Sequence, residues 1–265
     1  MEFIDTHAHL YLKEFTEDRT QIIQRALESK VTKIVLPNID FISYQDQLNL
    51  AKEFPGICYP TIGLHPCDVK ENYWTILDSM ELEFSNTQFI AIGETGTDAY
   101  WDLSFWENQT KSFSRQLEWA KTLQLPIIIH SRESIPQNIE LVSKHQDGSL
   151  RGVFHCFTGD LTQAKQIINL GFLLGIGGVV TYKNSDLKNI IDEIGLEHLV
   201  LETDSPFLTP VPFRGKRNES SYIPIIAEKI SEILDLSLET IAIKTTENAE
   251  GLFHFENYAT NYENL

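Results

Sequence analysis

Six residues whose side chains can bind metal ions are spread over nearly the whole chain, and each lies at or near the end of a short apolar run. They are His7, His9, Glu94, His130, His155 and Asp204. Four imidazoles and two carboxylates suit zinc, manganese or a similar divalent ion, whereas calcium prefers a shell of oxygen atoms. The sequence therefore predicts a metal site assembled from distant segments.

Two pairs of polar residues two positions apart help to place this site. On a strand, side chains two apart point to the same face, so the imidazoles of His7 and His9 should converge. Asp5 shares their spacing, and we expect its carboxylate to accept the ring N–H of a ligating imidazole. Glu202, two residues before Asp204, should face the interior below it as a further buried partner of the site.

The number of ligands predicts two metal ions. A catalytic zinc usually has about three protein ligands, so six ligands indicate two ions about 3.5 to 4 Å apart that share a carboxylate and a water. The shared water would act as a hydroxide on the bond to be broken. We assign catalytic roles to Glu94, as the bridge, and to Asp204, which would orient the hydroxide or take its proton. The ions would leave a small positive excess beside these carboxylates, which favours a phosphate oxygen as guest.

Candidate substrate contacts come from basic residues and from one further histidine. The densest basic cluster is in SPFLTPVPFRGKRNES, directly after Asp204, and we expect Arg214 and Arg217 to bind an anionic substrate there. Loops after the eighth strand of a barrel often hold phosphate, although a solvated loop is the alternative. His65, at the end of the apolar run in GLHP, and Arg132 should line the same mouth.

Eight apolar runs of strand length are separated by segments with helical patterns. Runs such as FIAIG, PIIIH and LVLE favour strands that are buried on both faces, as in a parallel sheet. The runs cover residues 3–7, 33–37, 58–64, 89–94, 126–130, 152–155, 172–176 and 199–202. Between them, Thr16 and Ser43 precede expected helices, and Gly171 and Gly195 stand where helices should end.

This alternation predicts an α/β fold, a single (β/α)8 TIM barrel that takes in residues 1–265 as one domain, with extra helices after Tyr222. The carboxyl ends of barrel strands meet at one face, where the six ligands would come together. The alternative is an open doubly wound sheet, which normally carries a glycine-rich turn after its first strand, where this chain has DTHAHL. We interpret the glycines of LLGIGG, in the seventh strand, as permitting close packing at the barrel rim.

Composition restricts the class of protein. The chain has 265 residues, of which 42% are hydrophobic, and a formal net charge of −17. Such a charge argues against a broad nucleic-acid-binding face. The chain shows no charged-then-apolar leader and no apolar run long enough for a membrane helix, so we expect a cytoplasmic protein without a membrane or stable protein partner. Cys58, Cys67 and Cys156 form no CxxC pair and fit reduced thiols.

Taken together, these motifs resemble the TatD family of metal-dependent deoxyribonucleases, within the amidohydrolase-like barrels. The resemblance covers essentially the whole chain and is carried by DTHAHL, GLHP, AIGETG, IIHSRE, GVFHCFTG, LETDSPFLTPVPFRGKRNES and TTENAEGLF. It implies that His7, His9 and Asp204 bind the first ion and that His130 and His155 bind the second. Glu94 would bridge the two ions.

The resemblance also implies an activity, 3'-5' exonuclease digestion of single-stranded DNA, with zinc, manganese or magnesium as activator. Magnesium suits four histidines least, because it prefers oxygen ligands. The chain departs from the family pattern at Thr97, Cys67, Phe213 and Ser220. We expect these residues in loops that touch the substrate, so they bear on substrate preference more than on metal chemistry.

Two other hypotheses are compatible with the sequence. The same metals could hydrolyse a small amide, a lactone or an ester such as D-aminoacyl-tRNA, and the negative charge of the chain favours this reading, because it repels a long polyanion. The chain could also be a scaffold that has kept the fold for binding alone. The presence of all six ligands makes the scaffold the weakest hypothesis.

Overall fold

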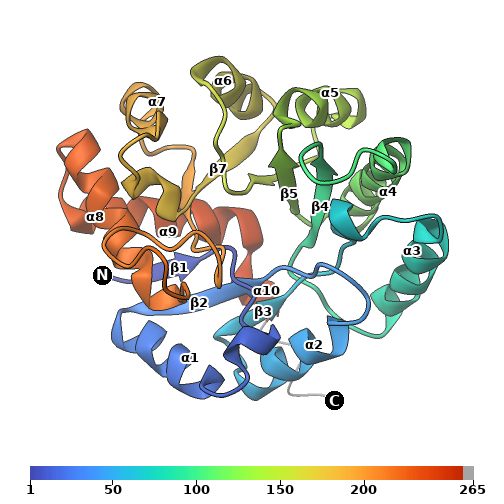
Figure 1. Cartoon of the computed structure of the whole chain (residues 1–265), viewed down its shortest axis with the longest axis horizontal. Coiled ribbons are helices and arrows are strands. Elements are labelled where there is room, and N and C mark those ends of the chain that lie inside the picture. The colour runs from blue at the N-terminus through green and yellow to red at the C-terminus, as the bar shows by residue number, and fades with distance from the viewer. Residues whose placement is uncertain (259–265) are drawn as a thin grey trace.

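Eight parallel strands form the centre of the computed structural model, which describes residues 1–258 (Figure 1). The strands are β1 (Phe3–Asp5), β2 (Val31–Leu36), β3 (Cys58–Pro60), β4 (Ile92–Asp98), β5 (Ile127–Arg132), β6 (Gly152–Phe154), β7 (Phe172–Ile176) and β8 (Leu199–Leu201). They pair as a three-stranded sheet, β1-β2-β3, and a five-stranded sheet, β4-β5-β6-β7-β8.

Parallel bridges close the two sheets into a barrel. Ile62, just after β3, pairs with Ile92 of β4, and Ala8, after β1, pairs with Ser205, after β8. At the second seam the backbone N–H of Asp204 also donates to the carbonyl of His7 at 2.9 Å. The predicted barrel is therefore confirmed, and its closing seam runs through two of the predicted ligands.

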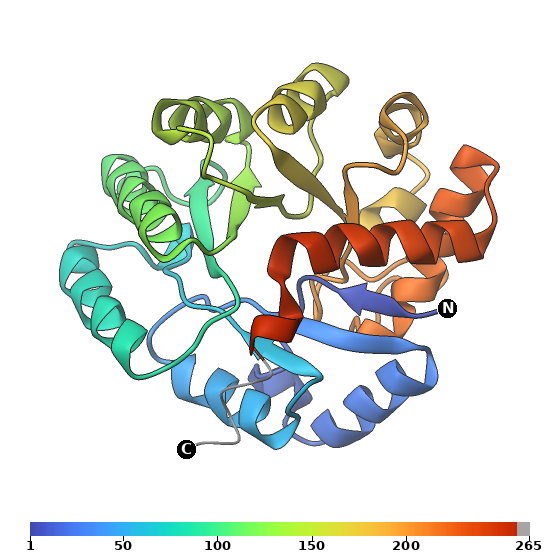
Figure 2. The same ribbon diagram turned by 180° about the vertical axis from the view of Figure 1, so that it is seen from behind.

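Helices surround the strands as an outer ring (Figure 1), and in Figure 2, the view from behind, α9 lies on the near side next to β1, with α10 at its end. The helices are α1 (Arg19–Glu28), α2 (Tyr44–Glu53), α3 (Tyr73–Leu82), α4 (Trp106–Leu123), α5 (Ile135–His145), α6 (Leu161–Asn169), α7 (Leu187–Ile194), α8 (Ile223–Leu234), α9 (Leu238–Phe253) and α10 (Phe255–Tyr258). Within residues 1–258, none of them combines the length and apolar composition of a membrane span.

The apolar core has two parts. The larger part fills the space between strands and helices, as parallel strands buried on both faces require. The smaller part packs Ile4, Val35 and Val200 of the strands against Phe253 of α9 and Phe255 of α10. These two helices therefore cover one end of the barrel interior and leave the opposite, carboxyl end of the strands for polar side chains.

Most of the predicted helix boundaries hold, whereas β3 ends at Pro60 and not at residue 64 as predicted. Ser43 directly precedes α2, and Gly171 and Gly195 follow α6 and α7 with left-handed φ values of 84° and 67°, which glycine adopts readily. The prediction for Thr16 was wrong, because α1 begins at Arg19 and Asp18 occupies the position before it.

Two further predictions concern β4 and the glycines of β7. β4 begins later than predicted and continues to Asp98, because residues 95–98 pair with β5 in register, Gly96 opposite His130. In β7, a side chain at Gly175 would overlap the carboxylate of Glu202, so this glycine permits close packing as predicted.

Candidate metal centre

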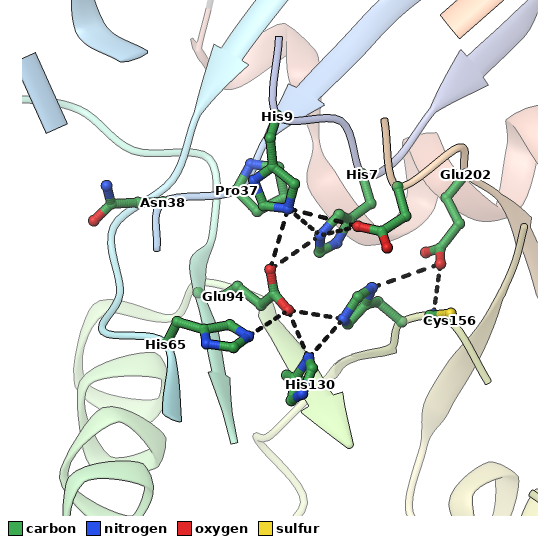
Figure 3. Close-up of polar contacts among 12 residues, drawn as sticks. His7, His9, Pro37, Asn38, His65, Glu94, His130, Cys156 and Glu202 are labelled. Carbon is green, nitrogen blue, oxygen red and sulfur yellow. Dashed lines mark hydrogen bonds and ion pairs between the residues drawn. The ribbon is translucent and has the colours of Figure 1, made fainter. Parts of the chain in front are cut away.

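The carboxylate of Glu94 lies between two groups of imidazoles at the carboxyl end of the barrel (Figure 3). Its Oε2 is 3.1 Å from Nε2 of His7 and 3.4 Å from Nε2 of His9. Its Oε1 is 2.8 Å from Nε2 of His155 and 2.9 Å from Nδ1 of His130. One carboxylate thus faces both groups, which is the arrangement that a bridging ligand requires.

Asp204 completes the first group. Its Oδ1 is 3.6 Å from Nε2 of both His7 and His9. The residue follows β8 with a left-handed φ of 55°, and its side chain is 15% exposed, the acid of this centre that reaches solvent most. The six sequence-predicted ligands are therefore brought together. Among the described residues, three overlapping sets could hold an ion. They are His7, His155 and Asp204; His7, His9 and Glu94; and His65, Glu94 and His130.

The ring of His9 is oriented by Tyr11, which sequence reasoning missed. The Tyr11 hydroxyl donates to the carbonyl of Pro37 at 2.6 Å and lies 3.2 Å from Nδ1 of His9. Because a hydroxyl has one proton, Tyr11 must accept from Nδ1–H of His9. The Nε2 lone pair of His9 is then free to face the carboxylates. Tyr11 shares the two-residue spacing of His7 and His9, and that spacing was the available signal.

The ring of His130 is oriented by Asp98, also missed, because the predicted β4 ended at Glu94. Asp98 Oδ2 lies 2.9 Å from Nε2 of His130. Hydrogen bonds from His130 and from the backbone of Tyr100 overcome the effect of burial and lower the pKa of Asp98 to about 2. An ionised carboxylate only accepts hydrogen bonds, so Nε2 of His130 carries the proton and Nδ1 presents its lone pair to Glu94.

The lone pairs of His9 and His130 face the negatively charged carboxylate of Glu94. Nε2 of His9 and Nδ1 of His130 both point at oxygens of Glu94, and two electron-rich atoms at such distances need a proton or a metal ion between them. Burial alone would lower the pKa of His9, yet hydrogen bonding to Asp204 and Glu94 raises it to about 9. Despite burial, the imidazoles of His155 and His7 hold the pKa of Glu94 well below its ordinary value. The centre therefore demands positive charge, which divalent ions can supply.

His65 lies at the same centre but presents an N–H group to Glu94 where His9 and His130 present a lone pair. Its Nδ1 accepts the backbone N–H of Cys67 at 3.1 Å, so a neutral ring carries its proton on Nε2. That nitrogen is 3.3 Å from Oε1 of Glu94. His65 is thus arranged as a hydrogen-bond donor toward an anion, which agrees with the substrate contact expected from the sequence.

Of the two buried acids expected to support the ligands, only Glu202 lies as predicted. It is fully buried, accepts the backbone N–H of Cys156 and lies 3.6 Å from Nδ1 of His155. The prediction for Asp5 was wrong in its partner. Its carboxylate accepts the backbone N–H groups of His7 and Thr203, because its neighbour Ile4 occupies the barrel interior. Asp5 therefore binds the β1–β8 seam.

A cavity of about 680 Å³ opens over the centre. Five of the six ligands line it, together with His65, Cys67, Trp101, Arg132, Phe207 and Leu208. The size is within the range of sites for small molecules or single nucleotides. Arg132 and His65, both predicted to contact the substrate, are thus at the mouth.

The other two predicted substrate contacts lie elsewhere. Arg217 donates to Asp18 at 2.6 Å and its guanidinium lies 4.7 Å from the ring of Phe15, so it binds the segment around the start of α1. Arg214 is exposed and stacks 4.2 Å from the ring of Tyr182. Neither lines the cavity. The loop after β8 thus brings Arg217 to the start of α1 and Arg214 to Tyr182, outside the cavity.

The four departures from the family pattern are also dispersed. Cys67 lines the cavity, as expected of a residue that affects the substrate. Thr97 is buried in β4 and its hydroxyl donates to Asn138 at 2.7 Å. Phe213 stacks on the ring of Tyr222, and Ser220 is buried. The expectation that all four touch the substrate was therefore wrong for Thr97, Phe213 and Ser220.

Comparison with known proteins identifies similar chains of nearly equal length. A family model described as TatD related DNase matches residues 4–254. The uncharacterized metal-dependent hydrolase YabD of Bacillus subtilis is 38% identical over 94% of this chain and 98% of its own. The 3'-5' ssDNA/RNA exonuclease TatD of Erwinia tasmaniensis is 29% identical over 94% of this chain and 99% of its own. The crystal structure of YJJV, a TatD homolog from Escherichia coli, superposes with a TM-score of 0.89 at 30% identity, over 95% of this chain and 98% of its own.

Proposed function

This chain belongs to the TatD family of metal-dependent hydrolases, and on that premise we propose that it is a two-metal deoxyribonuclease that removes nucleotides from the 3' end of single-stranded DNA. The observation that carries the proposal is the Glu94 carboxylate, with imidazole lone pairs directed at both of its oxygens. The relative from Erwinia tasmaniensis, named as an exonuclease on single-stranded DNA and RNA, supports this choice of substrate.

The donor set determines how the ions would be held. His7, His9 and Asp204 would hold the first ion, His130 and His155 the second, and Glu94 both. Imidazole nitrogen suits zinc or manganese better than magnesium. When bound, such a pair supplies a water activated for attack and neutralises charge on a phosphate.

The side chains of the centre would divide the remaining work. Although burial opposes ionisation, hydrogen bonding to His9 and the charge of His7 keep the pKa of Asp204 below its ordinary value. Its carboxylate, which reaches the cavity, can therefore orient the attacking water and accept its proton. His65 would donate Nε2–H to a phosphate oxygen, and Arg132 would bind a neighbouring phosphate.

The test combines metal analysis with a DNA substrate. Purified protein loaded with manganese should shorten a 5'-labelled single-stranded oligonucleotide from its 3' end, and elemental analysis should find about two ions per chain. The variant His130→Ala should lose metal and activity together. His145→Ala, which changes a histidine paired with Glu118 on the outside of the barrel, should lose neither. Protein that binds metal but leaves every DNA substrate intact would refute the nuclease assignment.

A second candidate function keeps the metals and changes the bond to a small amide, lactone or ester, such as D-aminoacyl-tRNA. It is favoured by the position of Arg214 and Arg217 outside the cavity, which leaves Arg132 as the one arginine or lysine among the residues that line it. Replacing Arg132 with alanine separates cleavage of DNA from hydrolysis of a small neutral substrate. A phosphodiesterase should weaken and become less sensitive to salt, whereas hydrolysis of a small neutral ester should be unchanged.

A further inference from the structure

Exposed apolar side chains gather around the mouth of the barrel. Of the fourteen large hydrophobic residues that are exposed in the described part of the chain, eight lie in the loops after β2, β4 and β8: Phe41, Ile42, Tyr100, Trp101, Leu103, Phe207, Leu208 and Val211. Exposed apolar groups concentrated beside an active site indicate a surface that a ligand covers. The side chains of the loop after β4 indicate what kind of ligand this is.

Trp101 is the most exposed aromatic residue of this group and has a distinct position. It is 67% exposed and lines both the cavity over Glu94 and a second cavity of about 250 Å³ beside it. The guanidinium of Arg132 lies 3.8 Å from the ring centroid of Tyr100 and 5.1 Å from that of Trp101. The guanidinium therefore lies over both aromatic rings at the edge of the metal centre.

One carboxylate connects this surface to the metal centre. Oδ1 of Asp98 accepts the backbone N–H groups of Tyr100 at 2.9 Å and Trp101 at 3.1 Å, while Oδ2 holds His130. The position of the Trp101 backbone is therefore set by the same side chain that orients a metal ligand. A group that stacks on Trp101 would have a defined position relative to the reacting phosphate.

We propose that Trp101, with Arg132 beside it, is a stacking subsite for a nucleobase of single-stranded nucleic acid, next to the phosphodiester at Glu94. This inference rests on the proposed nuclease function and names how the strand is held. Stacking on an aromatic ring contributes affinity for any base, because every base has a π-face. The chain has a net charge of −17, and Arg132 is the one arginine or lysine of residues 1–258 that lines the cavity. Base stacking would therefore supply binding energy that charge attraction does not. Bases of a duplex are already stacked, so the subsite selects single strands.

The test compares Trp101→Ala with wild-type enzyme on two 5'-labelled oligonucleotides in manganese. One has natural bases, and the other has abasic residues at its two 3'-terminal positions. On the natural strand, Trp101→Ala should lower kcat/KM by about 5- to 100-fold, mainly through KM, as expected for one lost base stack. On the abasic strand, wild type and Trp101→Ala should be equal, and Trp101→Phe should retain most activity on the natural strand.

Trp74→Ala is the matched control. Trp74 is an exposed tryptophan on α3, and a guanidinium, that of Arg115, lies 4.6 Å from its ring, but it lines neither of the two cavities. This variant should cleave both strands as wild type does. Equal cleavage of the natural strand by Trp101→Ala and wild type would overturn the proposal. So would an equal loss on both strands, because that pattern indicates a disturbed metal centre.

A binding measurement separates this inference from the proposed function. Fluorescence anisotropy of the labelled natural and abasic strands, with chelator present, reports stacking without catalysis. Weaker binding of the natural strand alone by Trp101→Ala supports the subsite even if wild-type enzyme cleaves no DNA, an outcome that refutes only the nuclease assignment. Unchanged binding of the natural strand overturns the subsite.

Discussion

Three of the five histidines at the centre have their proton placed by a neighbour that is not itself a predicted metal ligand. Tyr11 accepts from Nδ1 of His9, and Asp98 accepts from Nε2 of His130. The backbone N–H of Cys67 donates to Nδ1 of His65 and leaves its proton on the opposite nitrogen. Identical side chains thus become metal ligands or hydrogen-bond donors according to one contact each.

Asp98 therefore offers a direct test at the level of single residues. Asp98→Asn should weaken zinc binding by about 10- to 100-fold, as is typical when the partner of a ligating imidazole is changed. The reason is that a neutral amide no longer fixes the tautomer in which Nδ1 of His130 presents its lone pair. A competition titration against a chromophoric chelator measures the affinity.

Asp102→Asn is the control for this experiment. Asp102 is in the loop that follows β4, but its carboxylate accepts from the backbone of Ser104, so zinc affinity should be unchanged. If both variants bind zinc as tightly as wild type, the role given to Asp98 is refuted.

Among the elements, the loop after β8 is held against α1 by ion pairs. Arg25 of α1 donates to both oxygens of Glu219 at 2.8 and 2.6 Å, and Arg217 donates to Asp18. Asn218 donates to the carbonyls of Thr203 and Phe207 on either side of Asp204. The basic stretch that the sequence suggested for substrate binding therefore positions the loop that carries Asp204.

This contact predicts how stability depends on pH. Burial opposes ionisation of Glu219, but hydrogen bonds from Arg25 and Ser221 hold its pKa below the ordinary value. A carboxyl whose pKa is lower in the folded state stabilises that state above its unfolded pKa of about 4.3, and the stabilisation is lost as the pH falls through and below that value. Glu219→Gln should therefore cost about 1 to 2 kcal/mol of unfolding free energy at pH 7 and less at pH 4.

Urea denaturation at both pH values, with chelator present, measures this difference. Glu232→Gln, an exposed carboxylate on α8, is the control and should change the unfolding free energy little at either pH. A loss for Glu219→Gln that is as large at pH 4 as at pH 7 would show that the carboxylate charge is not the source of the stabilisation.

For the whole molecule, closure of the barrel brings together the residues of the proposed metal centre. They come from segments between His7 and Asp204, so the unfolded chain has no preformed site and metal would bind chiefly to the folded state. Binding of this kind stabilises the fold, by about 2.7 kcal/mol when metal is at 100 times its Kd.

Melting temperature should accordingly rise when zinc or manganese is added to protein freed of metal, by about 5 to 10 °C for a domain of this size. Magnesium should raise it less, because imidazoles are poor ligands for it. Differential scanning calorimetry measures the shift, and His130→Ala should reduce it. A wild-type melting temperature that does not respond to saturating zinc would contradict the metal centre.

The sequence by itself determined the barrel and the residues that meet at its mouth. Apolar runs, two-residue spacing and glycine helix ends are local signals, and strands that are all parallel bring their carboxyl ends to one face. This is why His7 and His130, far apart in the chain, could be assigned to one centre. The same two-residue spacing predicted that Glu202 is buried beside the centre, where it lies 3.6 Å from Nδ1 of His155.

The tertiary structure decided the contacts that depend on register and loop path. Asp98 reaches His130 because β4 continues past Glu94 beside β5. Asp5 faces away from the imidazole rings because the side chains stop alternating between the two faces of the strand after β1. Arg217 was assigned by charge, but the loop direction pairs it with Asp18. Such contacts join residues tens to hundreds of positions apart, so their geometry is set by packing across the whole barrel and no local pattern encodes it.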